Sequence, residues 1–221
     1  MSPTINEEAP ESGVPTQEDE EMEIEFFPLT PPSERMVRTL GLIGDVDEET
    51  SKAVISSLWL LKDSGGKEVW EDDQNPESEI LVVFEPIEML ISTNGGNADD
   101  MFAIYDVMRM TREFSAIHTI GIGKVMSAGT LLLAAGTKGQ RRVGKHCRIM
   151  IHSVIAGTHG PMHQLDNEMK EFKYIQDMYI KALVEETNLT EKQLKSLLKR
   201  KTNVYLTAEE AVEWGFADII V

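Results

Sequence analysis

Hydrophobic residues along the chain follow two spacings, and each spacing predicts one kind of element. Short apolar runs predict strands at Val37–Ile43, Ile87–Ser92, Ile117–Ile122 and Arg148–Ile151. Apolar residues three or four positions apart predict helices at about 47–61, 98–108, 128–135 and 164–186, followed by two shorter helices. Strands that alternate with helices in this way indicate an α/β domain built on a largely parallel sheet.

Polar residues mark the predicted helix starts, because their side chains can accept hydrogen bonds from the free N–H groups of a first turn. These residues are Asp47 or Asp45, Asn97, Thr190 with Gln193 as a capping box, and Thr207. The final helix, which begins after Thr207, is expected to end at Gly215.

Turn-forming residues predict two reversals of the chain. Lys67–Trp70 and Ile80–Phe84 flank a stretch rich in Asp, Asn and Pro, which is typical of a hairpin. Thr93–Gly96 is a predicted sharp turn that leads into the helix capped by Asn97.

Residues 1–33 differ from the rest of the chain. They contain runs of Glu and Asp, several prolines and no Lys or Arg. Such a segment cannot bury enough apolar surface to offset the entropy of ordering it, so we expect a disordered acidic tail. A removable propeptide is the functional alternative. The remaining residues, 34–221, are expected to form one domain.

Charge and cysteine content narrow the possible functions. The net charge of −17 disfavours nucleic acid and anionic membranes as partners, because both bind clustered Lys and Arg. The single cysteine, Cys147, cannot form an internal disulfide, which favours a reducing compartment. No apolar run approaches the length of a membrane span, and the acidic N-terminus is unlike a secretory or transit signal. We therefore expect a cytoplasmic protein.

Ser127 is a candidate nucleophile. It lies between a predicted strand and a short apolar helix, next to small residues that would let a substrate backbone approach. This is the arrangement of a nucleophile elbow, although the first glycine of the Gly-x-Ser-x-Gly pattern is missing. The alternative is that Ser127 only caps the helix.

His152 and Gly95-Gly96 could complete an acyl-transfer site with Ser127. His152 follows a buried strand, whose carboxyl end is a common place for a cleft residue. The flexible Gly95 backbone could direct an N–H group at a developing oxyanion, with a second N–H from Ala128. Each feature alone also fits a structural role, as a core histidine and an ordinary turn.

Four segments, in this order and spacing, resemble signatures of the Clp protease proteolytic subunit family. They are Asn94-Gly95-Gly96, Met126-Ser127-Ala128-Gly129, Arg148-Ile149-Met150-Ile151-His152 and Leu206–Gly215. The resemblance extends from about residue 35 to 221. It implies a crotonase-like α/β fold with repeated strand–strand–helix units and a protruding handle helix near 164–186.

The resemblance also implies a function and partners. Subunits of this family assemble into seven-membered rings, usually two stacked at the handle helices, and an ATP-dependent unfoldase feeds them unfolded polypeptides. Ser127 would attack the peptide bond, His152 would act as general base, and the N–H groups of Gly95 and Ala128 would form the oxyanion hole. No cofactor is implied.

The sequence departs from the family pattern at three places. The third catalytic position, Asp in the family, is Asn203, so the predicted site is Ser–His–Asn with reduced or conditional activity. An Asp-Arg pair that often links two rings is replaced by Lys201-Thr202, which leaves single or mixed rings open. The segment 65–85 is longer than usual, and is either a plain surface hairpin or a modified docking surface.

Other functions have less support from the sequence. A weakly active or inactive ring subunit that modulates a partner is the main alternative, and Asn203 favours it. An acyl-coenzyme A enzyme of the same fold would need cleft carboxylates, which we do not find. Lys124 could form a Ser–Lys dyad, but His152 makes it unnecessary. His159 and His163 have metal-like spacing, which Gly160-Pro161 between them opposes, and we predict no metal.

Overall fold

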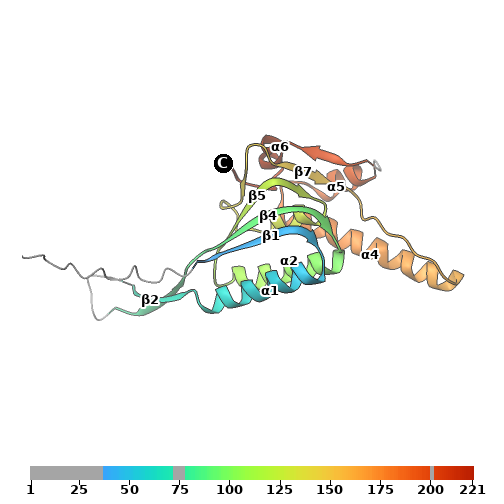
Figure 1. Ribbon diagram of the computed structural model, residues 1–221. Helices are drawn as coiled ribbons and strands as arrows, with labels where there is room; N and C mark the ends of the chain where they lie inside the picture. Colours follow the sequence, from blue (N-terminus) through green and yellow to red (C-terminus); the bar gives the residue numbers. More distant parts are fainter. Residues whose placement is uncertain (1–36, 72–77, 200–201) are drawn as a thin grey trace, which may run out of the picture. The chain divides into compact units, whose positions relative to one another are not determined.

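A seven-stranded sheet forms the centre of the described chain, which in this computed structural model comprises residues 37–71, 78–199 and 202–221 (Figure 1). In spatial order its strands are β1 (Thr39–Val46), β4 (Ile87–Gly96), β5 (Ile117–Met126), β6 (Arg142–Val143) and β9 (Ile219–Ile220), all parallel to their neighbours. The C-terminal part of β5 pairs with β7 (Arg148–Ile151), and β8 (Val204–Leu206) pairs antiparallel with β7. The prediction of an α/β domain with a largely parallel sheet is confirmed.

Helices α1 (Glu48–Asp63) and α2 (Ala98–Arg112) lie side by side along β1 and β4 (Figure 1). They bury apolar residues that the spacing predicted, including Val54, Leu58, Ile104 and Met108. The predicted caps are also confirmed. The Asp47 side chain accepts from the Thr50 N–H, and Asn97 accepts from two N–H groups of the first turn of α2.

Four further helices follow: α3 (Ala128–Ala134), α4 (Met162–Glu186), α5 (Glu191–Leu198) and α6 (Ala208–Glu213). Capping boxes begin α5 at Thr190 and α6 at Thr207, as predicted. Every residue of α3 is buried, which places this helix in the core next to the sheet. Helix α4 begins only after Pro161, so His159 and His163 do not share a helical turn.

Helix α4 has two unlike halves. Its buried residues all lie in the last turns, from Tyr179 to Glu186, whereas none of residues 162–178 is buried. Figure 1 shows this first half projecting away from the sheet, as the prediction of a protruding helix requires.

The predicted hairpin is present. Strands β2 (Gly66–Trp70) and β3 (Ile80–Phe84) pair antiparallel as a separate two-stranded sheet. Its base is anchored by the buried Arg38 guanidinium, which donates to the carbonyl oxygens of Leu61 (2.8 Å) and Glu85 (2.9 Å). Side chains on the strands themselves remain largely exposed.

One prediction about the backbone is wrong. Thr93–Gly96 does not form a sharp turn; the segment continues β4 to Gly96, because Asp45 and Val46 of β1 pair with Gly95 and Gly96. A shift in register between Ile43 and Asp45 accommodates the positive φ of Gly95 within this pairing. Strands β1 and β5 likewise continue beyond their predicted ends, to Val46 and Met126.

The expected acidic tail at 1–33, the turn of the hairpin at 72–77 and Lys201 lie outside the described residues. Within the described part of the chain, no helix is both long enough and apolar enough to cross a membrane.

Candidate active site

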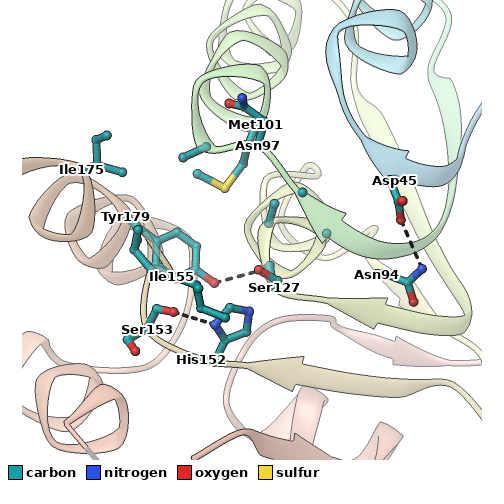
Figure 2. A pocket seen from close by; sticks show the side chains of 15 residues that line it. Asp45, Asn94, Asn97, Met101, Ser127, His152, Ser153, Ile155, Ile175 and Tyr179 are labelled. Atoms are coloured by element: carbon teal, nitrogen blue, oxygen red, sulfur yellow. Dashed lines mark hydrogen bonds between the residues drawn. The ribbon is translucent and has the colours of Figure 1, made fainter. Parts of the chain in front are cut away.

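Three strands end at the same edge of the sheet and bring the candidate residues together. Because β4, β5 and β7 are parallel, their carboxyl ends carry Gly95, Ser127 and His152 to one side. All three residues line a cavity of about 550 Å³. Figure 2 shows Ser127 and His152 within it, with Tyr179 and Ile155 beside them.

Ser127 has the backbone of a nucleophile elbow. Its φ is 53° and its ψ is −122°. Among the residues that the structure describes, it is the only one other than glycine with a positive φ. Such a conformation costs on the order of 1–3 kcal/mol and persists only where neighbouring contacts hold it. Its N–H donates to the Met150 carbonyl of β7 at 2.7 Å.

The side chain of Ser127 does not cap α3. Among the described residues, it makes no hydrogen bond to the first-turn N–H groups of that helix. The capping role, which was the alternative for this serine, is therefore not what the residue does here. Its half-buried side chain stays available to the cavity.

Gly95 touches the elbow directly. A Cβ atom at this position would lie 2.5 Å from the Ser127 Cβ and 3.0 Å from the Ala128 nitrogen, so only glycine fits. Its φ of +92° also favours glycine. The Gly95 N–H donates to the hydroxyl of the buried Thr93 at 2.9 Å, a partner that the sequence did not indicate.

His152 lies at the end of β7, but its hydrogen bonds differ from those of a complete triad. Its Nδ1 is 2.5 Å from the main-chain oxygen of Ser153. A carbonyl can only accept, so this contact places the proton on Nδ1 and leaves Nε2 free to accept another. Within the described structure no hydrogen bond joins His152 to Ser127, although both line one cavity.

Asn203 is close to His152 in register but does not line the cavity. Ile151 pairs with Val204 across the antiparallel β7 and β8, so the next pair beyond the ladder is His152 and Asn203. The exposed Asn203 side chain directs its Nδ2 to the Tyr205 hydroxyl at 3.5 Å. This orientation leaves its carbonyl oxygen available as an acceptor.

Sequence reasoning missed the residues whose hydroxyl groups hold the Ser127 carbonyl in place. The Thr130 hydroxyl donates to the Ser127 carbonyl at 2.7 Å, and the Tyr179 hydroxyl lies 2.7 Å from the Thr130 hydroxyl. Burial raises the pKa of Tyr179 to about 12, so its hydroxyl remains a donor. No local signal could have identified Tyr179, because it belongs to α4 and reaches Ser127 only through helix packing.

One wall of the cavity is apolar. It consists of side chains from α2, the segment after His152 and α4: Met101, Val154, Ile155, Ile175 and Tyr179. The opposite rim is polar and includes Asp45, which accepts from the Asn94 side chain at 3.2 Å. The cavity can therefore hold an apolar side chain next to a hydroxyl and an imidazole.

Comparison with known proteins identifies the family of this chain. The family model described as Clp protease matches residues 78–221, which is more than half of the sequence. The chain belongs to the Clp protease family. Its fold is thus the crotonase-like α/β fold of that family, as the resemblance implied.

Individual members of the Clp protease family match over most of the chain. A protein of Deinococcus radiodurans named ATP-dependent Clp protease proteolytic subunit is 31% identical over 176 residues, covering 80% of this chain and 76% of the relative. Proteins named ATP-dependent Clp protease proteolytic subunit 1 from Gloeobacter violaceus and Prochlorococcus marinus are 31% and 29% identical, each covering 83% of both chains.

The Clp protease match includes the whole proposed site. Gly95, Ser127, Ala128, His152 and Asn203 all lie inside residues 78–221. The match begins after β2, so the hairpin is only partly inside it.

Proposed function

We propose that this chain is a serine endopeptidase subunit in which Ser127 is the nucleophile and His152 the general base. The observation that carries the proposal is the shared cavity, in which a positive-φ serine with a free side chain and a strand-end histidine face one space. Membership of the Clp protease family supports peptide-bond hydrolysis as the reaction.

The proposed reaction follows from the donors and acceptors at the site. The Ser127 hydroxyl attacks the peptide carbonyl while His152 Nε2 accepts its proton and returns it to the leaving amine. The Ser153 main-chain oxygen supports this tautomer, because it accepts the Nδ1 proton. Water then hydrolyses the acyl–serine ester by the same route.

We assign the oxyanion hole to the N–H groups of Gly95 and Ala128. Both groups lie close to Ser127. Ala128 is the next residue in the chain, and a Cβ atom on Gly95 would lie 2.5 Å from the Ser127 Cβ and 3.0 Å from the Ala128 nitrogen. The Gly95 N–H would exchange its present acceptor, the Thr93 hydroxyl, for the oxyanion. Removal of one such donor typically costs a hundredfold or more in kcat.

We assign Asn203 as the third residue of the site. The β7–β8 register supports this role, because it makes Asn203 the cross-strand neighbour of His152. An amide oxygen can accept the Nδ1 proton, as in Cys–His–Asn enzymes, but it brings no negative charge to the imidazolium.

We further propose that the subunit assembles into seven-membered rings in the cytoplasm and receives unfolded polypeptides from an ATP-dependent unfoldase. The names of the relatives, which specify ATP dependence and a proteolytic subunit, support the ATP-dependent partner and the role of the chain as one subunit of an assembly. The buried thiol of Cys147 is consistent with a reducing compartment.

A second candidate is a weakly active or inactive ring subunit that modulates a partner peptidase. Two observations favour it: Asn203 stands where the family has an acid, and Ser127 and His152 are not hydrogen-bonded to each other in the described structure. The two candidates differ in whether Ser127 is reactive.

The test is covalent labelling of the full-length protein with a fluorophosphonate probe, read by intact mass. We expect one probe per chain, loss of labelling in Ser127→Ala and strongly slowed labelling in His152→Ala. Ser153→Ala is the matched control, because it removes a neighbouring hydroxyl from the same cavity and keeps the main-chain oxygen that contacts His152. If the wild-type chain stays unlabelled while labelling succeeds on another serine peptidase, the active-enzyme proposal fails and the modulating role stands.

A further inference from the structure

The peptide bond between Ser127 and Ala128 is held by a small group of buried hydroxyls. The Ser127 carbonyl accepts from the Thr130 N–H at 2.9 Å and from the Thr130 hydroxyl at 2.7 Å. The Tyr179 hydroxyl lies 2.7 Å from the Thr130 hydroxyl and 3.3 Å from the same carbonyl. Tyr179 and Thr130 are both buried, so water does not compete for these bonds.

Two hydroxyl protons serve this group, and in each possible arrangement at least one of them goes to the Ser127 carbonyl oxygen. If Thr130 donates to the Ser127 carbonyl, Tyr179 donates to Thr130; if Tyr179 donates to the carbonyl, Thr130 donates to Tyr179 or shares the carbonyl. Either arrangement uses every proton. In both, the Tyr179 hydroxyl fixes the direction of the Ser127 carbonyl.

The direction of this carbonyl determines the direction of the Ala128 N–H. The two groups belong to one planar trans peptide, so they point in opposite directions and rotate together. The Ala128 N–H is a proposed oxyanion donor, which must be aimed before the transition state forms. Ser127, whose φ is 53°, has an unfavourable backbone conformation and would tend to relax if the carbonyl were released.

We propose that Tyr179 is a positioning residue for the oxyanion hole, acting from α4 through Thr130 and the Ser127 carbonyl on the Ala128 N–H. This inference rests on the proposed function. Helix α4, which contributes no catalytic residue, would thus hold the peptide bond between Ser127 and Ala128 in place.

The main test is Tyr179→Phe, which removes the hydroxyl and keeps the ring that lines the cavity. Thr130 can still donate to the carbonyl, so the loss should be smaller than that of a complete oxyanion donor. We expect kcat for a short fluorogenic peptide to fall about tenfold with KM nearly unchanged, because the oxyanion contact exists only in the transition state. The rate of fluorophosphonate labelling should fall by a similar factor.

The matched control is Tyr105→Phe. Tyr105 is also buried and its hydroxyl donates to Glu186 at 3.1 Å, but it does not line the cavity. Both variants lose one buried tyrosine hydroxyl and should lose comparable thermal stability, whereas only Tyr179→Phe should lose kcat. A role in stability alone would lower the melting temperature in both and leave kcat unchanged in both.

Substitutions at Thr130 test the connection between Tyr179 and the carbonyl. Thr130→Ser keeps the hydroxyl and should retain activity, whereas Thr130→Val should lose it. The double variant of Thr130→Val with Tyr179→Phe should be slower than Thr130→Val by less than the factor that Tyr179→Phe costs alone, because both hydroxyls act on one carbonyl. Fully multiplicative losses would overturn the proposal.

Failure of this inference is distinguishable from failure of the proposed function. A wild-type protein that is not labelled would refute the serine peptidase itself. Labelling of Tyr179→Phe at the wild-type rate, in a protein that is labelled at Ser127, would refute only the role of Tyr179.

Discussion

At the scale of single residues, the proposed site lacks a negative charge next to the imidazole. His152 Nδ1 contacts a main-chain oxygen of Ser153, and its cross-strand neighbour is the neutral Asn203. Both can set the tautomer, but neither stabilises the imidazolium that forms when Ser127 loses its proton. The proposed site therefore lacks one electrostatic contribution to the proposed reaction.

Asn203→Asp should supply that contribution. In a Ser–His–Asp enzyme, loss of the acid by substitution with Asn costs about ten-thousandfold in kcat. We expect a smaller gain in the reverse direction, at least about tenfold in kcat at neutral pH, because Ser153 already holds the tautomer. Hydrolysis of a short fluorogenic peptide measures it.

Asn203→Ala is the matched control for this substitution, because it removes the amide without adding a charge. Its kcat should fall only modestly if Ser153 is sufficient to orient His152. An Asn203→Asp protein no faster than the wild type would show that the missing charge does not limit the reaction.

The sequence identifies the residues with reactive groups but not those that hold them. Ser127 and His152 follow predicted strands, and the parallel sheet brings strand ends together, so their proximity could be expected. Thr130 and Tyr179 could not be found this way. Their contact depends on how α4 packs on α3, which no local pattern specifies.

At the scale of elements, features that depend only on neighbouring residues could be predicted from the sequence. Pairing between strands that are distant in the sequence could not. Helix caps depend on a side chain and the turn after it, so Asp47 and Thr190 were correctly assigned. Thr93–Gly96 has the composition of a turn, yet pairing with β1 keeps it in a strand. Strands β6 and β9 have two residues each, too few to produce a hydrophobic pattern.

A largely buried ion pair joins the starts of β6 and β9 to the end of α4, in addition to the pairing of the two strands. The Arg141 side chain, 5% exposed, contacts Asp218 and also donates to the Glu186 carbonyl at 2.6 Å. Asp218→Asn would leave the Arg141 charge without its partner, and we expect a loss of about 3 kcal/mol in the free energy of unfolding. Glu88→Gln is the control, since the neighbouring Arg142–Glu88 pair is more exposed and should contribute under about 1 kcal/mol.

Acid should reduce the difference in stability between wild type and Asp218→Asn. Burial acts to raise the pKa of Asp218, but hydrogen bonds and charge from Arg141 outweigh it and lower the pKa below its ordinary value. A carboxyl with a lowered folded-state pKa stabilises the protein above the unfolded value of about 3.9 and loses that contribution as pH falls through the folded value. Urea unfolding at neutral pH and near pH 3, at one protein concentration, measures the difference. A gap that stays constant would contradict this assignment.

At the scale of the whole molecule, exposed apolar side chains lie on α4 and on the hairpin, and we expect other chains to bind there. On the projecting half of α4, Met169 is 49% and Tyr174 58% exposed, and on the hairpin Val82 is 56% exposed. Large exposed apolar groups gathered on one element are typical of association sites. The net charge of −17 opposes non-specific association, so we expect any contacts between subunits to be specific.

Native mass spectrometry should show a ring of seven subunits as the species that persists on dilution. Two rings would meet through α4, but Lys201-Thr202 replaces the Asp-Arg pair that often links them, so a fourteen-subunit species should form only at high protein concentration. Met169→Glu places a charge on the apolar face of α4 and should abolish the larger species while keeping the ring of seven. Gln164→Glu adds the same charge at another exposed position of α4 and should change neither. Rings that separate into single subunits in Met169→Glu would place the contacts within one ring on α4 instead, because a charge at a contact between rings leaves each ring intact.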